Sequence, residues 1–243
     1  LLAVEHGVLL AFAEGRGLRQ KGSCADHGDV MLVLKRSTDN GATWSPLSVV
    51  RDEFPSATSI GNPAPVYDRV TGTVWLLYNR DNSRGFVLHS LDAGLTWSAP
   101  AEITATTALP GSFFAYGPPG GLQLPGSGRL VVGAYTNEAG SYAVYSDDGG
   151  LSWTHGRAVG LPGTGECQVA SCGAATGAGG VPDVLLMRDA NGTRILAHST
   201  SGGTQWSAGS APVGLSPSSA CEASVVAVAR PDWMCVLVAS QTW

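Results

Sequence analysis

The chain has 243 residues, of which 44% are hydrophobic and 14% charged, and its formal net charge is −5. This composition supplies enough apolar material for a core and argues against a disordered chain. The acidic balance offers no basic surface for nucleic acid, and no apolar stretch approaches the roughly 20 residues of a transmembrane segment.

Short apolar runs recur along the chain between Gly, Pro, Asn and Asp residues. They are rich in β-branched and aromatic side chains, which predicts strands joined by tight turns. In chain order, the expected strands cover residues 30–34, 73–78, 86–89, 129–135, 142–145, 184–187, 194–198, 225–229 and 234–239. We therefore expect an all-β chain.

One phrase, with the pattern Ser-x-Asp-x-Gly-x-Thr-Trp, returns four times. Its copies occupy residues 37–44, 90–97, 146–153 and, in degenerate form, 199–206. In such a phrase Ser and Asp can accept hydrogen bonds from turn amides, Gly permits a positive φ, and Trp covers the corner. Because each Asp belongs to a separate copy and none has calcium-loop spacing, we expect the aspartates to be structural.

The corners begin at Ser37, Ser90, Ser146 and Ser199, so their spacings are 53, 56 and 53 residues. A period near this length, with three or four strands in each, predicts the blades of a β-propeller. A β-sandwich would explain the strands but not the period, and a solenoid would repeat throughout each unit. We expect residues 1–243 to form a single propeller domain of about four to five blades, truncated at both ends.

Four other segments are more specific than the corners. They are GVLLAFAEGR at 7–16, GNPAPVYD at 61–68, FAYGPPGGLQL at 114–124 and ECQVA at 166–170. Together with the corners they resemble the sialidases, or neuraminidases, whose Asp-box (BNR) repeats build six-bladed propellers. The resemblance covers nearly the whole chain. It implies an exo-α-sialidase that removes terminal sialic acids from glycoproteins, glycolipids or oligosaccharides with retention, using no metal or organic cofactor.

The resemblance also implies catalytic roles. A carboxylate nucleophile would be repelled by the substrate's own carboxylate, and sialidases use a tyrosine instead. Glu166 matches the base that activates this tyrosine. Arg188 matches one of three arginines that bind the substrate carboxylate, a bidentate task suited to guanidinium. Asp26 matches the acid/base residue, and Asp29, three residues on, is the competing assignment.

Three further residues match positions that line the sialic-acid pocket, namely Arg16, Asn62 and Tyr135. The loop between Arg16 and Asp26 is longer than in some relatives, which leaves the placement of Arg16 open. A turn asparagine and a core-facing tyrosine are the ordinary alternatives for Asn62 and Tyr135. No metal site is expected, since the five cysteines show neither CxxC spacing nor paired histidines.

Three parts of the family pattern have no match in residues 1–243: the first and third carboxylate-binding arginines and the nucleophilic tyrosine. We therefore expect these residues alone to be inactive or nearly so. The alternative reading is a non-catalytic Asp-box propeller that binds glycans or proteins. A trans-sialidase, which shares the matched residues, is a third.

Overall fold

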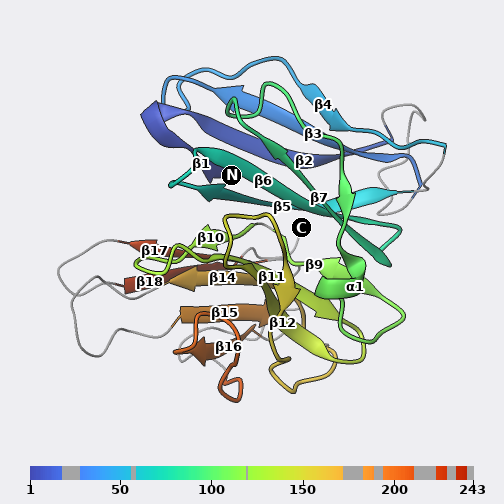
Figure 1. Ribbon diagram of the computed structural model, residues 1–243, viewed down its shortest axis with the longest axis vertical. Helices are drawn as coiled ribbons and strands as arrows, with labels where there is room; N and C mark the ends of the chain where they lie inside the picture. Colours follow the sequence, from blue (N-terminus) through green and yellow to red (C-terminus); the bar gives the residue numbers. More distant parts are fainter. Residues whose placement is uncertain are drawn as a thin grey trace.

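The computed structural model describes residues 1–17, 28–55, 59–118, 120–171, 183–188, 194–210, 223–228 and 234–239. Every pairing between named strands is antiparallel, and the described strands form five sheets, each built from consecutive stretches of the chain (Figure 1). The expectation of an all-β chain is confirmed. Two short helical turns, η1 (Glu5–Gly7) and α1 (Thr104–Thr107), are added.

Sheet 1 has the order β1 (Leu2–Ala3), β2 (Leu9–Arg16), β3 (Val30–Ser37), β4 (Ser48–Arg51). Sheet 2 has the order β5 (Ile60–Asp68), β6 (Thr73–Arg80), β7 (Arg84–Ser90), β8 (Ala101–Glu102). Sheet 3 has the order β10 (Leu122–Gln123), β11 (Leu130–Thr136), β12 (Gly140–Ser146), β13 (Thr154–His155), and β9 (Phe114–Tyr116) also pairs with β11. Sheet 4 has the order β14 (Gly165–Ser171), β15 (Asp183–Arg188), β16 (Arg194–Ser199), and sheet 5 pairs β17 (Ala223–Val228) with β18 (Met234–Ala239).

Successive sheets pack face to face, and their apolar side chains form the cores between them. Sheets 1 and 2 enclose one cluster around Leu32, Ile60 and Leu76. Sheets 2 and 3 enclose a larger one that contains Trp75, Phe114, Tyr116, Val132 and Tyr142. Sheets 3 and 4 share a third, around Val131, Cys167 and Met187. This stacking of consecutive sheets is the arrangement of β-propeller blades.

Each repeated corner is closed by its own polar side chains, as expected. In the first corner, the Ser37 hydroxyl donates to Asp39 Oδ1 at 2.7 Å and accepts from the Gly41 amide at 2.8 Å. The Thr43 amide and hydroxyl both donate to the Asp39 carboxylate, at 2.8 and 2.6 Å. In the fourth corner Ser201 stands in place of Asp and accepts from the Gln205 amide at 2.9 Å. The corner fold therefore survives without the carboxylate.

Three of the corners also dock on the preceding sheet. The Arg36 guanidinium of sheet 1 donates to the carbonyl of Ala93 in the second corner, at 2.9 Å. Gly150 of the third corner lies against the Trp75 ring of sheet 2. Arg129 of sheet 3 donates to the carbonyls of residues 201 and 202 in the fourth corner. These three corners thus contact the preceding sheet as well as ending the strand that leads into them.

Candidate active site

A cavity of about 380 Å³ opens at the ends of the strands that lie opposite the corners. The register shows this directly: Leu9 of β2 pairs with Ser37, where the first corner begins, whereas Arg16 at the other end of β2 lines the cavity. Its lining comes from sheets 1 to 4 and the segments that join their strands: Glu14, Arg16, Val30, Ser59, Gly61, Asn62, Asn82, Phe113, Tyr135 and Glu166. The cavity is therefore shared by four successive sheets.

Glu166 and Arg188 form an ion pair at the sheet 4 wall. Arg188 Nη2 lies 2.9 Å from Glu166 Oε1, and the two side chains are 36% and 17% exposed. The pair follows from strand register, since Arg188 at the end of β15 faces Gly165 at the start of β14. Glu166 has a φ of 42° at a register shift between Gly165 and Gln168. A left-handed glutamate is uncommon and marks a site held in place by its surroundings.

Tyr135 forms the neighbouring part of the wall. Its ring lies over Gly165, where a β-carbon would come within 2.8 Å of the ring carbons, so any larger residue at 165 would displace it. On another side the ring packs against Phe113, with centroids 5.6 Å apart. Phe113 is held by its main chain, whose amide donates to Asn137 Oδ1 at 3.0 Å. The two rings give the cavity an aromatic side.

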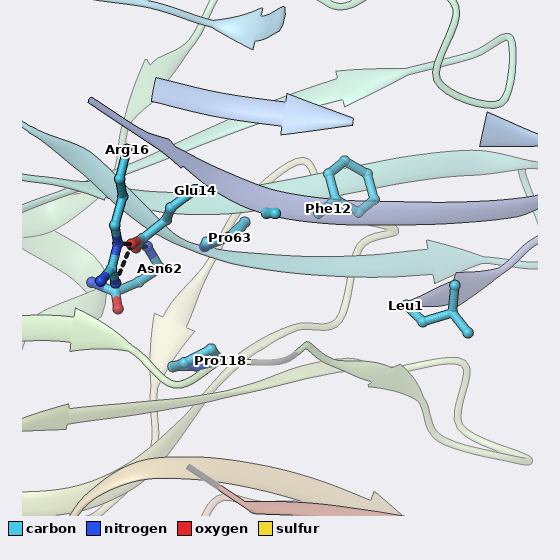
Figure 2. Close-up of a pocket in the computed structure, with 8 residues that line it drawn as sticks. Leu1, Phe12, Glu14, Arg16, Asn62, Pro63 and Pro118 are labelled. Carbon is cyan, nitrogen blue, oxygen red and sulfur yellow. Dashed lines mark hydrogen bonds and ion pairs between the residues drawn. The ribbon is translucent and has the colours of Figure 1, made fainter. Parts of the chain in front are cut away.

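Glu14 links Arg16 to Asn62 on the opposite side. Arg16 Nε and Nη2 contact Glu14 Oε2 at 2.9 and 2.7 Å. The other carboxylate oxygen, Oε1, accepts from the main-chain amide of Asn62 at 2.8 Å. Gly61 leaves the space for this carboxylate, because a β-carbon there would lie 2.4 Å from Glu14 Oε1. Figure 2 shows Glu14, Arg16 and Asn62 converging on an adjoining hollow of about 360 Å³, which Pro63 and Pro118 also line.

Asn62 repeats the backbone conformation of Glu166. Its φ is 53°, and it lies at a register shift between Gly61 and Ala64, close to the start of β5. Its side-chain Nδ2 donates to Asn82 Oδ1 at 2.8 Å. Asn82 belongs to the turn between β6 and β7, so two segments of sheet 2 meet at this point of the wall.

The structure thus brings together most of the residues that the sequence singled out. Arg16, Asn62, Tyr135 and Glu166 line one cavity, and Arg188 contacts Glu166. Tyr135 lines the cavity and Asn62 lies within β5 at its register shift, while their roles in sugar binding stay predictions. Asp26 lies outside the described residues. Its competitor Asp29 is described, and its main-chain carbonyl accepts from the Gly17 amide at 3.0 Å.

Six lining residues were not singled out from the sequence: Val30, Ser59 and Gly61, and also Glu14, Phe113 and Asn82, whose side chains shape the site. Glu14 could have been found, since it stands two positions before Arg16 in the family-like segment GVLLAFAEGR, and alternate residues of a strand share a face. Asn82 shows only the Asp-Asn pattern of a turn, and Phe113 has no local signal. Both reach the cavity through tertiary packing.

Among the described residues that line this cavity, none is a corner aspartate. The hydroxyl of Thr43 is the main cause that lowers the pKa of Asp39 to about 2, and the hydroxyl of Thr96 does the same for Asp92.

In the described part of the chain, no group of three or more His, Cys, Asp or Glu side chains could hold a metal ion. No helix in the described residues is long and apolar enough to cross a membrane.

Comparison with known proteins gives the family of this chain. A family model described as a BNR repeat-like domain matches residues 7–242. Human sialidase-4 is 34% identical to this chain over an alignment of 246 residues. The alignment covers 85% of this chain and 48% of human sialidase-4. The chain belongs to the sialidase family with BNR repeats.

Two further members support the assignment. Human sialidase-3 is 32% identical to this sialidase-family chain, over an alignment that covers 80% of the chain and 52% of human sialidase-3. Among solved structures, the Hadza microbial sialidase Hz136 is 25% identical with a TM-score of 0.77, covering 93% of this chain and 48% of its own. The chain spans about half the length of these curated relatives.

Proposed function

We propose that the whole protein is an exo-α-sialidase that hydrolyses terminal α-linked sialic acids on glycoproteins, glycolipids or oligosaccharides. The observation that carries the proposal is the Glu166–Arg188 pair at the wall of a cavity also lined by Arg16, Asn62 and Tyr135. A sialic acid brings a carboxylate next to the reacting carbon, so its site needs a fixed guanidinium. Arg188, held by Glu166 at a strand end, supplies one.

Glu166 takes the role of base in this proposal. A free tyrosine has a pKa near ~10 and needs a neighbouring base to attack as a nucleophile. The tyrosine gives its proton to Glu166 as its oxygen forms a bond to the anomeric carbon, while the glycosidic oxygen leaves with a proton from Asp26; the tyrosine regains the proton from Glu166 when it is later released. Water then attacks the same carbon, gives its proton to Asp26 and releases the tyrosine, so two inversions give net retention.

Arg16, Asn62 and Tyr135 bind the remainder of the sugar. Arg16 and Asn62 contribute polar groups, whereas Tyr135 and Phe113 contribute aromatic rings that suit the sugar's C–H groups. The four charged side chains discussed at this site form two ion pairs, Arg16 with Glu14 and Arg188 with Glu166. Because each arginine is paired with a carboxylate, the site favours local recognition of a substrate carboxylate over general attraction of anions.

We also propose that the sheets belong to a six-bladed propeller ring, with the nucleophilic tyrosine and the two further arginines contributed outside the motifs matched here. Residues 1–243 by themselves are then inactive. The relatives described above carry the names of sialidases, which favours the hydrolase over a non-catalytic binding module.

The test is hydrolysis of a fluorogenic sialoside by the longest natural form of the protein that contains residues 1–243. We expect turnover, and we expect NMR to show the α-anomer as the first sialic acid released. Binding of sialylated glycans without release would replace the proposal by the binding module. Robust turnover by residues 1–243 alone would overturn the proposal that the nucleophilic tyrosine and the two further arginines lie outside these motifs.

A further inference from the structure

Asn62 is held at the cavity wall by one hydrogen bond from its main chain and one from its side chain. Its main-chain amide donates to Glu14 Oε1, and its Nδ2 donates to Asn82 Oδ1, each at 2.8 Å. A carboxamide carries two N–H donors and one oxygen acceptor. With one donor engaged by Asn82, the oxygen and the second N–H remain for a ligand. The contact with Asn82 therefore decides which end of the amide a sugar meets.

The turn that carries Asn82 is anchored by other groups. Asp81 and Asn82 have φ values of 49° and 45°, two successive residues in the left-handed region. The Asp81 amide donates to the carbonyl of Ser59 at 3.0 Å, and the Ser59 amide donates to Asp81 Oδ1 at 2.8 Å. The carbonyl of Asn82 accepts from the Phe114 amide at 2.7 Å, which ties the turn to β9. These bonds use the Asp81 side chain and main-chain atoms, leaving the Asn82 carboxamide for Asn62.

We propose that Asn82 is a positioning residue for sugar binding: it orients the Asn62 carboxamide so that its oxygen receives a hydroxyl or amide N–H of the bound sialic acid. The inference rests on the proposed function and adds a residue from the β6–β7 turn to it. Asn82 acts through Asn62, so its effect falls on sugar affinity and leaves the bond-breaking step unchanged.

The experiment is a double-mutant cycle on Asn82→Gly and Asn62→Gly. Glycine adopts positive φ readily, so both substitutions keep the backbone and remove only the side chain. For sialoside hydrolysis by the longest natural form, we expect Asn82→Gly to raise KM about threefold to tenfold, the effect of one neutral hydrogen bond, with kcat nearly unchanged. In the Asn62→Gly background the same substitution changes nothing further, because the pair acts as one unit.

A second measurement follows the hydrogen bond itself. The side-chain NH₂ signals of Asn62, assigned by their loss in Asn62→Gly, should lose protection from solvent exchange in Asn82→Gly. They should keep it in Asn82→Asp, which retains the acceptor and tolerates the left-handed turn. This variant also keeps the test informative if Asn82→Gly does not fold.

An unchanged KM in Asn82→Gly, or an equal effect with and without Asn62, would overturn the inference while leaving the sialidase proposal standing. Unaltered protection of the Asn62 signals would do the same. If the unaltered protein neither cleaves the sialoside nor binds N-acetylneuraminic acid, the proposed function fails and the inference fails with it.

Discussion

Asn62 and Glu166 occupy equivalent positions in two different sheets. Each follows a glycine near the start of its strand, each has a positive φ of 53° or 42°, and each lies at a register shift. A bulge re-aims the side chain of the residue it contains. The same local device, used in β5 and in β14, therefore directs one amide and one carboxylate to the same cavity.

Replacing Glu166 with Gln keeps the shape of the side chain and removes its basicity. If Glu166 is the base, kcat/KM for a sialoside should fall by about 100-fold or more, the usual contribution of general base catalysis. The control is Glu102→Gln, which neutralises another carboxylate paired with an arginine, Arg84, away from the cavity. Equal activity of the two variants in a fluorogenic assay would remove Glu166 from the mechanism.

Gly165→Ala should reduce activity by displacing Tyr135. The new β-carbon would lie 2.8 Å from the Tyr135 ring, closer than packed carbon atoms allow, so the ring must move. We expect kcat/KM to fall about tenfold, in line with the loss that small misplacements of site groups cause.

The matched background for this prediction is Tyr135→Ala, in which the ring is already gone. There, Gly165→Ala should cause no additional loss, because the clash has been removed. A similar loss in both backgrounds would show that the alanine acts on Glu166 or on the strand itself.

Gly150→Ala should destabilise the protein more than Gly149→Ala. Both glycines have positive φ, 95° and 69°, so alanine at either position costs about 1 kcal/mol of backbone strain. At Gly150 the added methyl would also collide with the Trp75 ring, whereas at Gly149 the nearest atom is 3.4 Å away. Urea denaturation should show an additional loss of about 1–3 kcal/mol at Gly150. Equal losses of stability would mean that the third corner does not pack against sheet 2.

The corner aspartates should make stability depend on pH in the acid range. The pKa values of Asp39 and Asp92 fall from 3.8 to about 2 on folding, mainly through the hydroxyls of Thr43 and Thr96. Lowered pKa values give stabilisation that is complete above about pH 4 and is lost as pH falls towards 2. The free energy of unfolding should therefore decline across this range.

The fourth corner, with Ser201 in place of Asp, supplies the matched variant for that test. Asp39→Ser combined with Asp92→Ser should flatten the decline between pH 4 and pH 2, whatever its effect at neutral pH. Parallel pH curves for the variant and the unaltered protein would show that other carboxylates cause the acid sensitivity.

Much of the fold could be predicted from the sequence because its strongest signals are local. All nine strands expected from apolar runs are present, with ends shifted by a few residues. The strands that apolar patterning missed, such as β5 and β14, contain the Gly, Pro and polar residues that usually indicate turns. Only the family resemblance pointed to their segments. The blade number and the domain limits stay predictions.

Residues of the candidate site could be predicted where they match a sequence motif, but not where only tertiary packing brings them to the cavity. Glu166, Arg188, Arg16, Asn62 and Tyr135 match positions of the family pattern, and they meet around Glu166 and one cavity. Asn82 and Phe113 reach it from a turn and a connecting segment, whose positions depend on contacts with neighbouring sheets. Such positions follow from no pattern within a short stretch of sequence.

The docking of the second, third and fourth corners on the preceding sheets bears on how such a chain arises. Because the second, third and fourth corners all meet the sheet before them, each unit of sheet and corner offers its successor the same kind of surface. Tandem duplication of a single gene segment would then give a protein whose copies stack at once. The opposite strand ends do not make these contacts, so they are free to differ from copy to copy in the residues that they bring to the cavity.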